Sequence, residues 1–107
     1  MDFEEYQAHA NRTRKTNSPN ELVDYLFGLV GEVGELVNCL KKHLYHGHDF
    51  NSFEVQTEAG DILWYLSAIL STLNLNFEDV AVQNVIKLQK RYPNGFNVED
   101  SRNRKED

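Results

Sequence analysis

The sequence predicts an all-α fold of four helices. Apolar residues recur at spacings of three and four, strand patterns are nearly absent, and Pro19 and Pro93 bracket the most patterned part of the chain. The 107 residues leave room for one hydrophobic core, and 40% hydrophobic with 26% charged residues is ordinary for a soluble globular protein. We therefore expect one helical domain over residues 1–96 and a frayed or disordered polar tail over residues 97–107.

The first two predicted helices cover residues 2–16 and 19–44. A narrow apolar stripe marks the first of them. The second begins after Ser18, where a capping-box spacing to Glu21 coincides with a proline at the first helical position. Its end is expected before Gly47, which can adopt a left-handed backbone conformation.

The third and fourth predicted helices cover residues 52–73 and 77–91. Asn51 and Asn76 precede them, and an asparagine side chain can accept a hydrogen bond from a free amide at a helix start. A Pro-Asn-Gly sequence at residues 93–95 then stops the fourth helix.

Four carboxylates occupy distinctive positions on the second and third helices. Glu32 and Glu35 are neighbours on a helix surface and flank a broad apolar arc, whereas Glu58 points among apolar residues with Asp61 at their edge. The apolar arc of the second helix consists of Leu22, Leu26, Leu29, Val30, Val33, Leu36, Val37 and Leu40. We expect this arc to be the core face of the helix.

Three glycines, Gly28, Gly31 and Gly34, lie inside the second helix beside these acids. Each glycine within a helix costs about 1 kcal/mol relative to alanine, so their presence predicts a close approach to the backbone.

A carboxylate that faces a core costs several kcal/mol unless it is neutralised, paired or bound to a metal. One acidic pair alone is more often a solvated helix flank, but two such pairs on adjacent apolar helices favour a shared cation. Carboxylate oxygens suit magnesium or manganese. A di-iron bundle would use Glu-x-x-His pairs, and Glu35, Asn38 and Asp61 stand where those histidines would be.

The composition disfavours several other functions. A formal net charge of −6 would repel a polynucleotide backbone, and no run of eighteen apolar residues predicts a membrane span. The single cysteine, Cys39, cannot form an internal disulfide, so we expect a cytoplasmic protein. Three histidines within residues 41–48 lack the partners of a tetrahedral zinc site, and this segment is expected to be a connecting loop from which Lys42 can reach a phosphate.

Three segments together resemble a known family. They are GEVGEL at residues 31–36, EAGDILWY at residues 58–65 and NVIKLQKRYPNGF at residues 84–96. Their Glu-x-x-Glu, Glu-x-x-Asp and basic signatures resemble the MazG-like all-α nucleoside triphosphate pyrophosphohydrolases over residues 18–96. Many members carry two adjacent acids at the start of the first motif, whereas Gly31 precedes Glu32 here. The departure leaves four ligands rather than five.

The resemblance implies hydrolysis of an NTP or dNTP to the monophosphate and pyrophosphate by a four-helix bundle. Magnesium, or manganese in its place, would be held by Glu32, Glu35, Glu58 and Asp61. The attacking water would be activated by the metal or oriented by Glu32 or Glu35, the two expected catalytic residues.

The resemblance also implies a substrate-binding set and an assembly. Lys87 and Arg91 would bind phosphates, Asn84 phosphate or sugar, and Tyr65 would lie near the substrate. Trp64 is a candidate for base stacking or for packing, and packing is favoured. The bundle would be completed by a homodimer or homotetramer.

Two other functions are consistent with the sequence. One is a non-catalytic helical interaction or regulatory module, and the other is a pyrophosphohydrolase of a different phosphorylated, nucleotide-like ligand.

Overall fold

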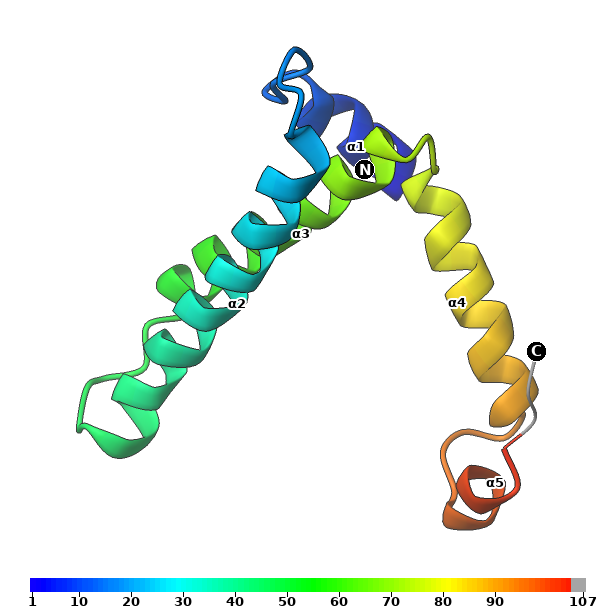
Figure 1. Ribbon diagram of the computed structural model, residues 1–107. Helices are drawn as coiled ribbons and strands as arrows, with labels where there is room; N and C mark the ends of the chain where they lie inside the picture. Colours follow the sequence, from blue (N-terminus) through cyan, green and yellow to red (C-terminus); the bar gives the residue numbers. More distant parts are fainter. Residues whose placement is uncertain (105–107) are drawn as a thin grey trace.

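The computed structural model describes residues 1–104, which form five helices joined by short connections (Figure 1). The helices are α1 (Phe3–Asn11), α2 (Glu21–Tyr45), α3 (Ser52–Thr72), α4 (Phe77–Arg91) and α5 (Val98–Arg102). The predicted all-α class is confirmed. None of the helices is long and apolar enough to cross a membrane.

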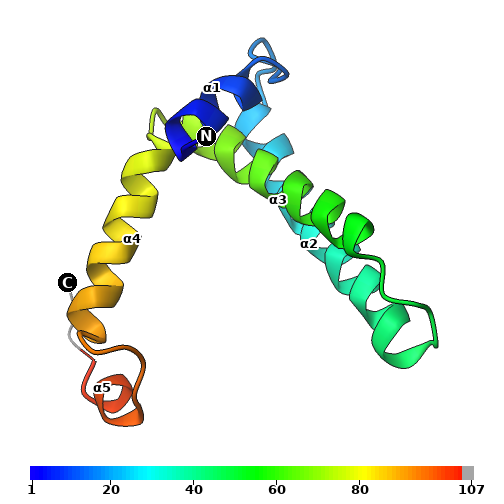
Figure 2. The same cartoon turned by 180° about the vertical axis from the view of Figure 1, so that it is seen from behind.

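The α2–α3 pair is the framework of the fold. The two helices run side by side in both views and make the most extensive interhelical contact (Figures 1 and 2). A small core of Tyr25, Ala68 and Ile69 lies at the end of the pair that α1 covers, with Leu22, Leu29, Trp64 and Tyr65 packed against it.

The Gln7 side chain of α1 links the C-terminal end of α3 to the start of α4 through hydrogen bonds. Its buried side chain donates hydrogen bonds to Ser71 Oγ and the Leu75 carbonyl, both at 2.9 Å. It also accepts one from the Phe77 amide at 2.8 Å. Since a buried amide must find partners for its donors and acceptor, these three bonds fix where α4 begins.

The asparagine caps predicted for α3 and α4 are present. Asn51 accepts from the Glu54 amide at 3.1 Å, and Asn76 accepts from the Asp79 amide at 3.2 Å. The predicted bounds of these two helices are accordingly correct to within one residue.

The capping box predicted at the start of α2 is not formed. Asn20 is the N-cap and its side chain makes no capping bond, while Ser18 Oγ accepts from the Asn20 amide at 3.2 Å. Glu21 does not complete a capping box because Arg14 Nε binds its Oε1 at 2.6 Å across the α1–α2 loop. The same loop begins after Asn11, so α1 ends five residues earlier than predicted.

The C-terminal segment also differs from the prediction. Residues 98–102 form α5 rather than a frayed tail, and Asn97 caps this helix by accepting from the Asp100 amide at 2.7 Å. An asparagine followed by acidic residues is a helix-start signal that the polar composition hid. Residues 105–107 of the predicted tail lie outside the described residues.

The predicted four-helix bundle does not close within one chain, because α4 diverges from the α2–α3 pair (Figures 1 and 2). The Cα radius of gyration is 17.1 Å, against about 13 Å for a compact domain of this length. The accessible surface is 8058 Å², about 1,900 Å² more than a compact 12.4 kDa monomer exposes.

The open shape leaves much of the predicted core face uncovered. On α2, Val30 is 71% exposed and Val37 is 58% exposed, and Leu26 and Val33 are also exposed. On α4, the exposed apolar side chains include Val82, Val85, Ile86 and Leu88. The periodicity located the apolar face of α2, but α3 covers only part of it, and the apolar side chains of α4 were not predicted as a face.

Gly28 allows α2 and α3 to approach closely. A Cβ atom placed on Gly28 would collide with the Tyr65 ring, whereas one placed on Gly31 or Gly34 would meet nothing within 4 Å. The predicted close approach is therefore found at Gly28 and is absent at the other two glycines within the described chain.

Gly28→Ala is expected to destabilise the fold. Displacing the Tyr65 ring costs about 1–3 kcal/mol, which exceeds the gain of about 1 kcal/mol from replacing a helical glycine. Thermal unfolding should show a lower Tm for Gly28→Ala. The matched variant Gly60→Ala meets no atom within 4 Å in α3 and should melt at the wild-type temperature or higher. Equal melting of the two variants would contradict the close contact.

Glu21→Gln is expected to lower Tm at neutral pH. The Arg14 hydrogen bond lowers the pKa of Glu21, opposed by burial and aided by the Tyr25 hydroxyl. An acid with a lowered folded-state pKa stabilises the fold above its unfolded pKa of about 4.3, and that contribution is lost as the pH falls through the folded value. The Tm difference between Glu21→Gln and wild type should therefore shrink below about pH 4.3. A difference independent of pH would contradict this role, and Glu4→Gln on α1 serves as the control.

Candidate functional site

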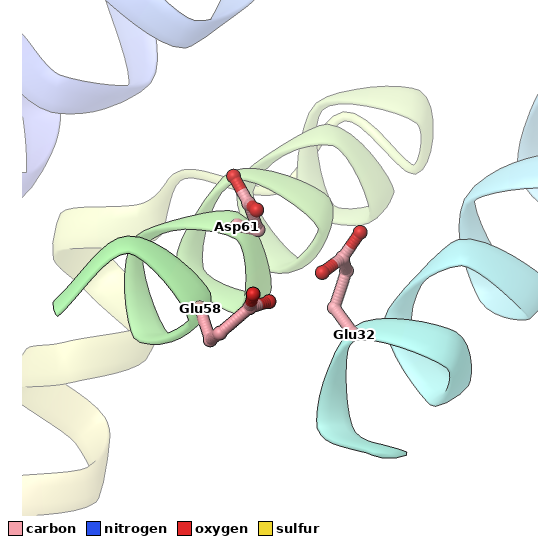
Figure 3. A group of neighbouring side chains, drawn as sticks. All are labelled: Glu32, Glu58 and Asp61. Carbon is pink, nitrogen blue, oxygen red and sulfur yellow. The ribbon is translucent and has the colours of Figure 1, made fainter. Parts of the chain in front are cut away.

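Three carboxylates from two helices converge between α2 and α3. Glu32 extends from α2 toward α3, where Glu58 and Asp61 lie one turn apart (Figure 3). Each of the three offers an oxygen, and these oxygens lie within 4.8 Å of one another. The spacing of three residues places Glu58 and Asp61 on one side of α3, and the close approach of the helices at Gly28, one turn before Glu32, brings the third acid to them.

The cluster is electrostatically strained in the absence of a cation. Burial raises the pKa of Glu32, and so do the negative charge of Asp61 and a hydrogen bond to Glu58. Among residues 1–104, none of the three carboxylates has a lysine or arginine within ion-pair distance. Like charges gathered without a protein cation, with oxygen as the only donor atom, suit a hard divalent cation such as magnesium or manganese.

The burial of the cluster differs from the expectation that Glu58 faces the core. Glu58 and Glu32 are half-buried, and Asp61 is exposed. Glu58 points toward Glu32 of the neighbouring helix (Figure 3). The three carboxylates therefore keep surface that is accessible to a ligand.

Glu35 lies beside the group but outside it. Its side chain is exposed, and its charge contributes to the raised pKa of Glu32 after the larger effects of burial, Asp61 and Glu58. Three of the four predicted metal ligands are therefore brought together, and the fourth stands one turn of α2 further toward the α2–α3 loop.

The predicted phosphate-binding residues are not near the cluster within one chain. Asn84, Lys87 and Arg91 are on α4, which diverges from the α2–α3 pair (Figure 1). Asn84 is exposed, while Lys87 and Arg91 are half-buried. Arg91 Nε is buried and has no hydrogen-bond partner within the described part of the chain.

Tyr65 and Trp64 lie next to the cluster on α3. The Tyr65 ring packs on Gly28, and Trp64 contacts it edge-on with ring centroids 5.1 Å apart. Tyr25 of α2, which the sequence did not single out as a site residue, completes this aromatic group. Its helical spacing from Glu32 is the signal that could have identified it.

The histidine-rich segment lies where α2 ends and the connection to α3 begins. It comprises the last turn of α2 and the loop after it, where His43 Nδ1 lies 3.0 Å from the His48 carbonyl oxygen. Within residues 1–104, the carboxylate cluster is the group of side chains arranged to hold a metal, and the histidines form none. Nearby, burial and a hydrogen bond to Glu54 raise the pKa of Cys39, which makes this thiol a poor nucleophile.

Comparisons with known proteins identify the family of the chain. Residues 17–96, which contain α2, α3 and α4, match the family described as MazG nucleotide pyrophosphohydrolase domain. The Gene 37 protein of Mycobacterium phage L5 is 36% identical over 72 residues, which cover 64% of this chain and 63% of the phage protein. No solved structure matches the chain. Since the family match spans most of the chain and includes every member of the carboxylate cluster, the chain belongs to the MazG nucleotide pyrophosphohydrolase domain family.

Proposed function

We propose that this protein hydrolyses a nucleoside or deoxynucleoside triphosphate to the monophosphate and pyrophosphate, with magnesium or manganese as cofactor. The observation that carries the proposal is the cluster of Glu32, Glu58 and Asp61 between α2 and α3. In the reaction, a water oxygen bonds to the α-phosphorus and the bond from that phosphorus to the α–β bridging oxygen breaks. Pyrophosphate leaves with the electron pair, and the water releases a proton.

The cluster explains why the reaction needs a cation. A triphosphate carries roughly four negative charges near neutral pH, and three carboxylates alone would repel it. When bound by Glu32, Glu58 and Asp61, a divalent cation supplies the positive charge that binds the phosphates and stabilises the charge developing in the transition state. The carboxylates then act by holding that charge at a fixed place between α2 and α3.

We assign the orientation of the attacking water to Glu35. This acid is beside the cluster, yet its oxygens are not among those that converge on the cation position. An exposed carboxylate can accept a hydrogen bond and then the proton from water. Glu32 is the less suitable proton acceptor because its oxygen is part of the cation-binding group.

The first experiment combines a nucleotide panel with a metal titration. Magnesium should raise the Tm of the wild-type protein, because a ligand that binds the folded state alone stabilises it. Glu58→Gln keeps the shape of the side chain and removes a charged ligand, so it should abolish the magnesium-dependent shift and lower pyrophosphate release at least 100-fold. Glu54→Gln, one turn earlier on α3 and outside the cluster, is the matched control.

Two results would contradict the proposal. The enzyme function is wrong if no nucleoside triphosphate yields pyrophosphate and magnesium leaves the Tm unchanged. Phosphorus NMR of the products identifies which phosphoanhydride bond is broken, and release of single phosphates would contradict attack at the α-phosphorus.

We further propose that a second copy of the chain completes the site. The surplus surface of about 1,900 Å² is about twice what one standard-size interface removes from each partner. Apolar side chains are exposed on α2 and along α4, and two copies can bury these faces against each other. The assembly is accordingly a homodimer or a homotetramer that contains this dimer.

The basic residues of α4 give that assembly a chemical role. Lys87 and Arg91 lie on a helix that diverges from the carboxylate cluster of its own chain. Arg91 is half-buried, and a guanidinium group binds phosphate through paired N–H donors. Placed against the cluster of a second copy, these residues would bind the phosphates of the substrate held at that copy's carboxylates.

Mixed oligomers test this arrangement. Glu58→Gln and Arg91→Ala should each be nearly inactive alone. In a heterodimer, one of the two sites combines the intact carboxylates of one chain with the intact α4 of the other. Random assembly should therefore restore about a quarter of wild-type activity, because half of the dimers are mixed and each holds one intact site.

The two chains should be refolded together, and the activity compared with that of the same chains refolded apart. If activity stays at the sum of the separate variants while mixed dimers form, the phosphate-binding residues act within one chain. A monomeric active protein in sedimentation experiments would also contradict the shared site.

A further inference from the structure

The direction of α4 is set at its first turn. Among the described helices, α4 packs mainly on α1 and less on α3, and beyond its start it diverges from the α2–α3 pair (Figures 1 and 2). Lys87 and Arg91, the proposed phosphate-binding residues, lie in its second half. Whatever fixes the start of α4 therefore also fixes where these two side chains reach.

The backbone between α3 and α4 leaves the direction of α4 open. The connection covers residues 73–76, and Asn74 has a left-handed φ of 58°. The Leu75 amide donates to the Leu70 carbonyl at 2.8 Å, which ties this part of the connection to α3. The extended residue Asn76 follows, and rotation about its backbone bonds would turn α4 as a whole.

The Gln7 side chain bridges this rotatable point. Its amide nitrogen donates to Ser71 Oγ of α3 and to the Leu75 carbonyl, and its amide oxygen accepts from the Phe77 amide of α4. The side chain is 8% exposed, so little water can compete for these partners. A glutamine amide supplies N–H donors and one carbonyl oxygen, and both kinds of group are used here. One side chain of α1 thus links both sides of the connection.

Aromatic packing on α1 reinforces this link. Phe77, the first residue of α4, is buried, stacks on Phe3 with ring centroids 4.7 Å apart and meets Tyr6 edge-on at 6.3 Å. The Phe3 amide also donates to Glu78 Oε2 at 2.9 Å. Spacings of three and four residues place Phe3, Tyr6 and Gln7 on one face of α1. That face holds the first turn of α4.

A small rotation at the start of α4 becomes a large displacement at its basic residues. Arg91 follows Phe77 by fourteen residues, which is about 21 Å along the helix axis. A tilt of about 10° at Phe77 would therefore move Arg91 by about 4 Å, which exceeds the length of a hydrogen bond, about 3 Å. Contact between Arg91 and a phosphate thus requires that the angle of α4 be held.

We propose that Gln7 is a positioning residue of the enzyme, which fixes the angle between α3 and α4 and so places Lys87 and Arg91 for the phosphates of the substrate. The inference rests on the proposed function and adds a role for α1. Because α1 precedes residues 17–96, this role belongs to a part of the chain outside the family match.

A distance measurement tests the angle directly. Gln56→Cys on α3 and Gln89→Cys on α4, both at exposed positions, are spin-labelled in a Cys39→Ser background, and the labelled chains are diluted with unlabelled ones. Double electron–electron resonance should give a single narrow distance distribution when Gln7 is present.

Gln7→Met keeps a side chain of similar length but removes its hydrogen-bonding groups. It should shift or broaden the spin–spin distance distribution by about 3 Å or more, the displacement that a tilt of about 10° produces near the end of α4. An unchanged narrow distribution in Gln7→Met would overturn the inference.

A kinetic measurement tests the consequence for the substrate. Gln7→Met should raise KM for the triphosphate about tenfold, because the phosphate contacts of α4 are weakened. A merely structural role would reduce the amount of folded enzyme, which lowers the apparent kcat and leaves KM unchanged. The magnesium-dependent rise in Tm should persist in Gln7→Met, since the carboxylates of the cluster are not among the partners of Gln7.

Two further variants keep this test decisive. Ser71→Ala removes one of the three partners, so it should raise KM by about threefold even if Gln7→Met fails to fold. Asn51→Ala removes the cap of α3, and it should lower Tm while KM stays at the wild-type value. An unchanged KM in folded Gln7→Met, or in Ser71→Ala where Gln7→Met does not fold, would overturn the inference.

The two measurements separate failure of this inference from failure of the proposed function. If the wild-type protein hydrolyses no triphosphate, the proposed function is rejected, and the spin–spin distances still decide whether Gln7 fixes the angle. If the wild-type protein is active but Gln7→Met leaves the distances or KM unchanged, the enzyme is retained and the positioning role is rejected.

Discussion

The close approach of α2 and α3 at Gly28 is the contact on which the site depends. Without a side chain at this position, the Tyr65 ring lies directly against the backbone of α2. Glu32 follows Gly28 by one turn and Asp61 precedes Tyr65 by one turn. The contact between Gly28 and Tyr65 therefore also sets the distance between the two helices at the carboxylates. The same ring also lines a hollow next to the α1–α2 loop. One missing side chain therefore sets the geometry of the cation position and of its neighbouring pocket.

The sequence predicted the start of a helix well where the capping residue and the amide that it binds are close together in the chain. Asn51 and Asn76 cap α3 and α4 as expected, because a side chain that binds an amide three residues later needs no distant partner. The same reasoning failed at Glu21, which the guanidinium of Arg14 captures across a loop. A capping-box spacing does not reveal a competing ion pair formed by a residue outside it.

The sequence predicted which acids belong to the site better than it predicted how they are arranged. Helical spacing identified Glu32, Glu35, Glu58 and Asp61, and three of them converge. Glu35 is exposed because its direction on α2 differs from that of Glu32 by about 60°. Periodicity likewise located the apolar face of α2, but an apolar face does not encode whether its partner is in the same chain. The bundle was expected to be completed by a second copy, and the direction in which α4 diverges was not predicted.

The distance between the basic residues of α4 and the carboxylate cluster of the same chain fits the proposed function. If Lys87 and Arg91 packed onto the carboxylates of their own chain, they would neutralise Glu32, Glu58 and Asp61 and compete with a metal ion for them. Because α4 diverges from the cluster, the acids keep their unfavourable mutual repulsion, which together with the larger effect of burial raises the pKa of Glu32. A divalent cation would relieve this repulsion. In the proposed dimer, basic residues from a second copy would meet the substrate's phosphates rather than bare carboxylates, since the cation would already occupy the acids. An acidic protein could thus act on an acidic substrate, because metal and substrate would bind before opposite charges of the chain cancel one another.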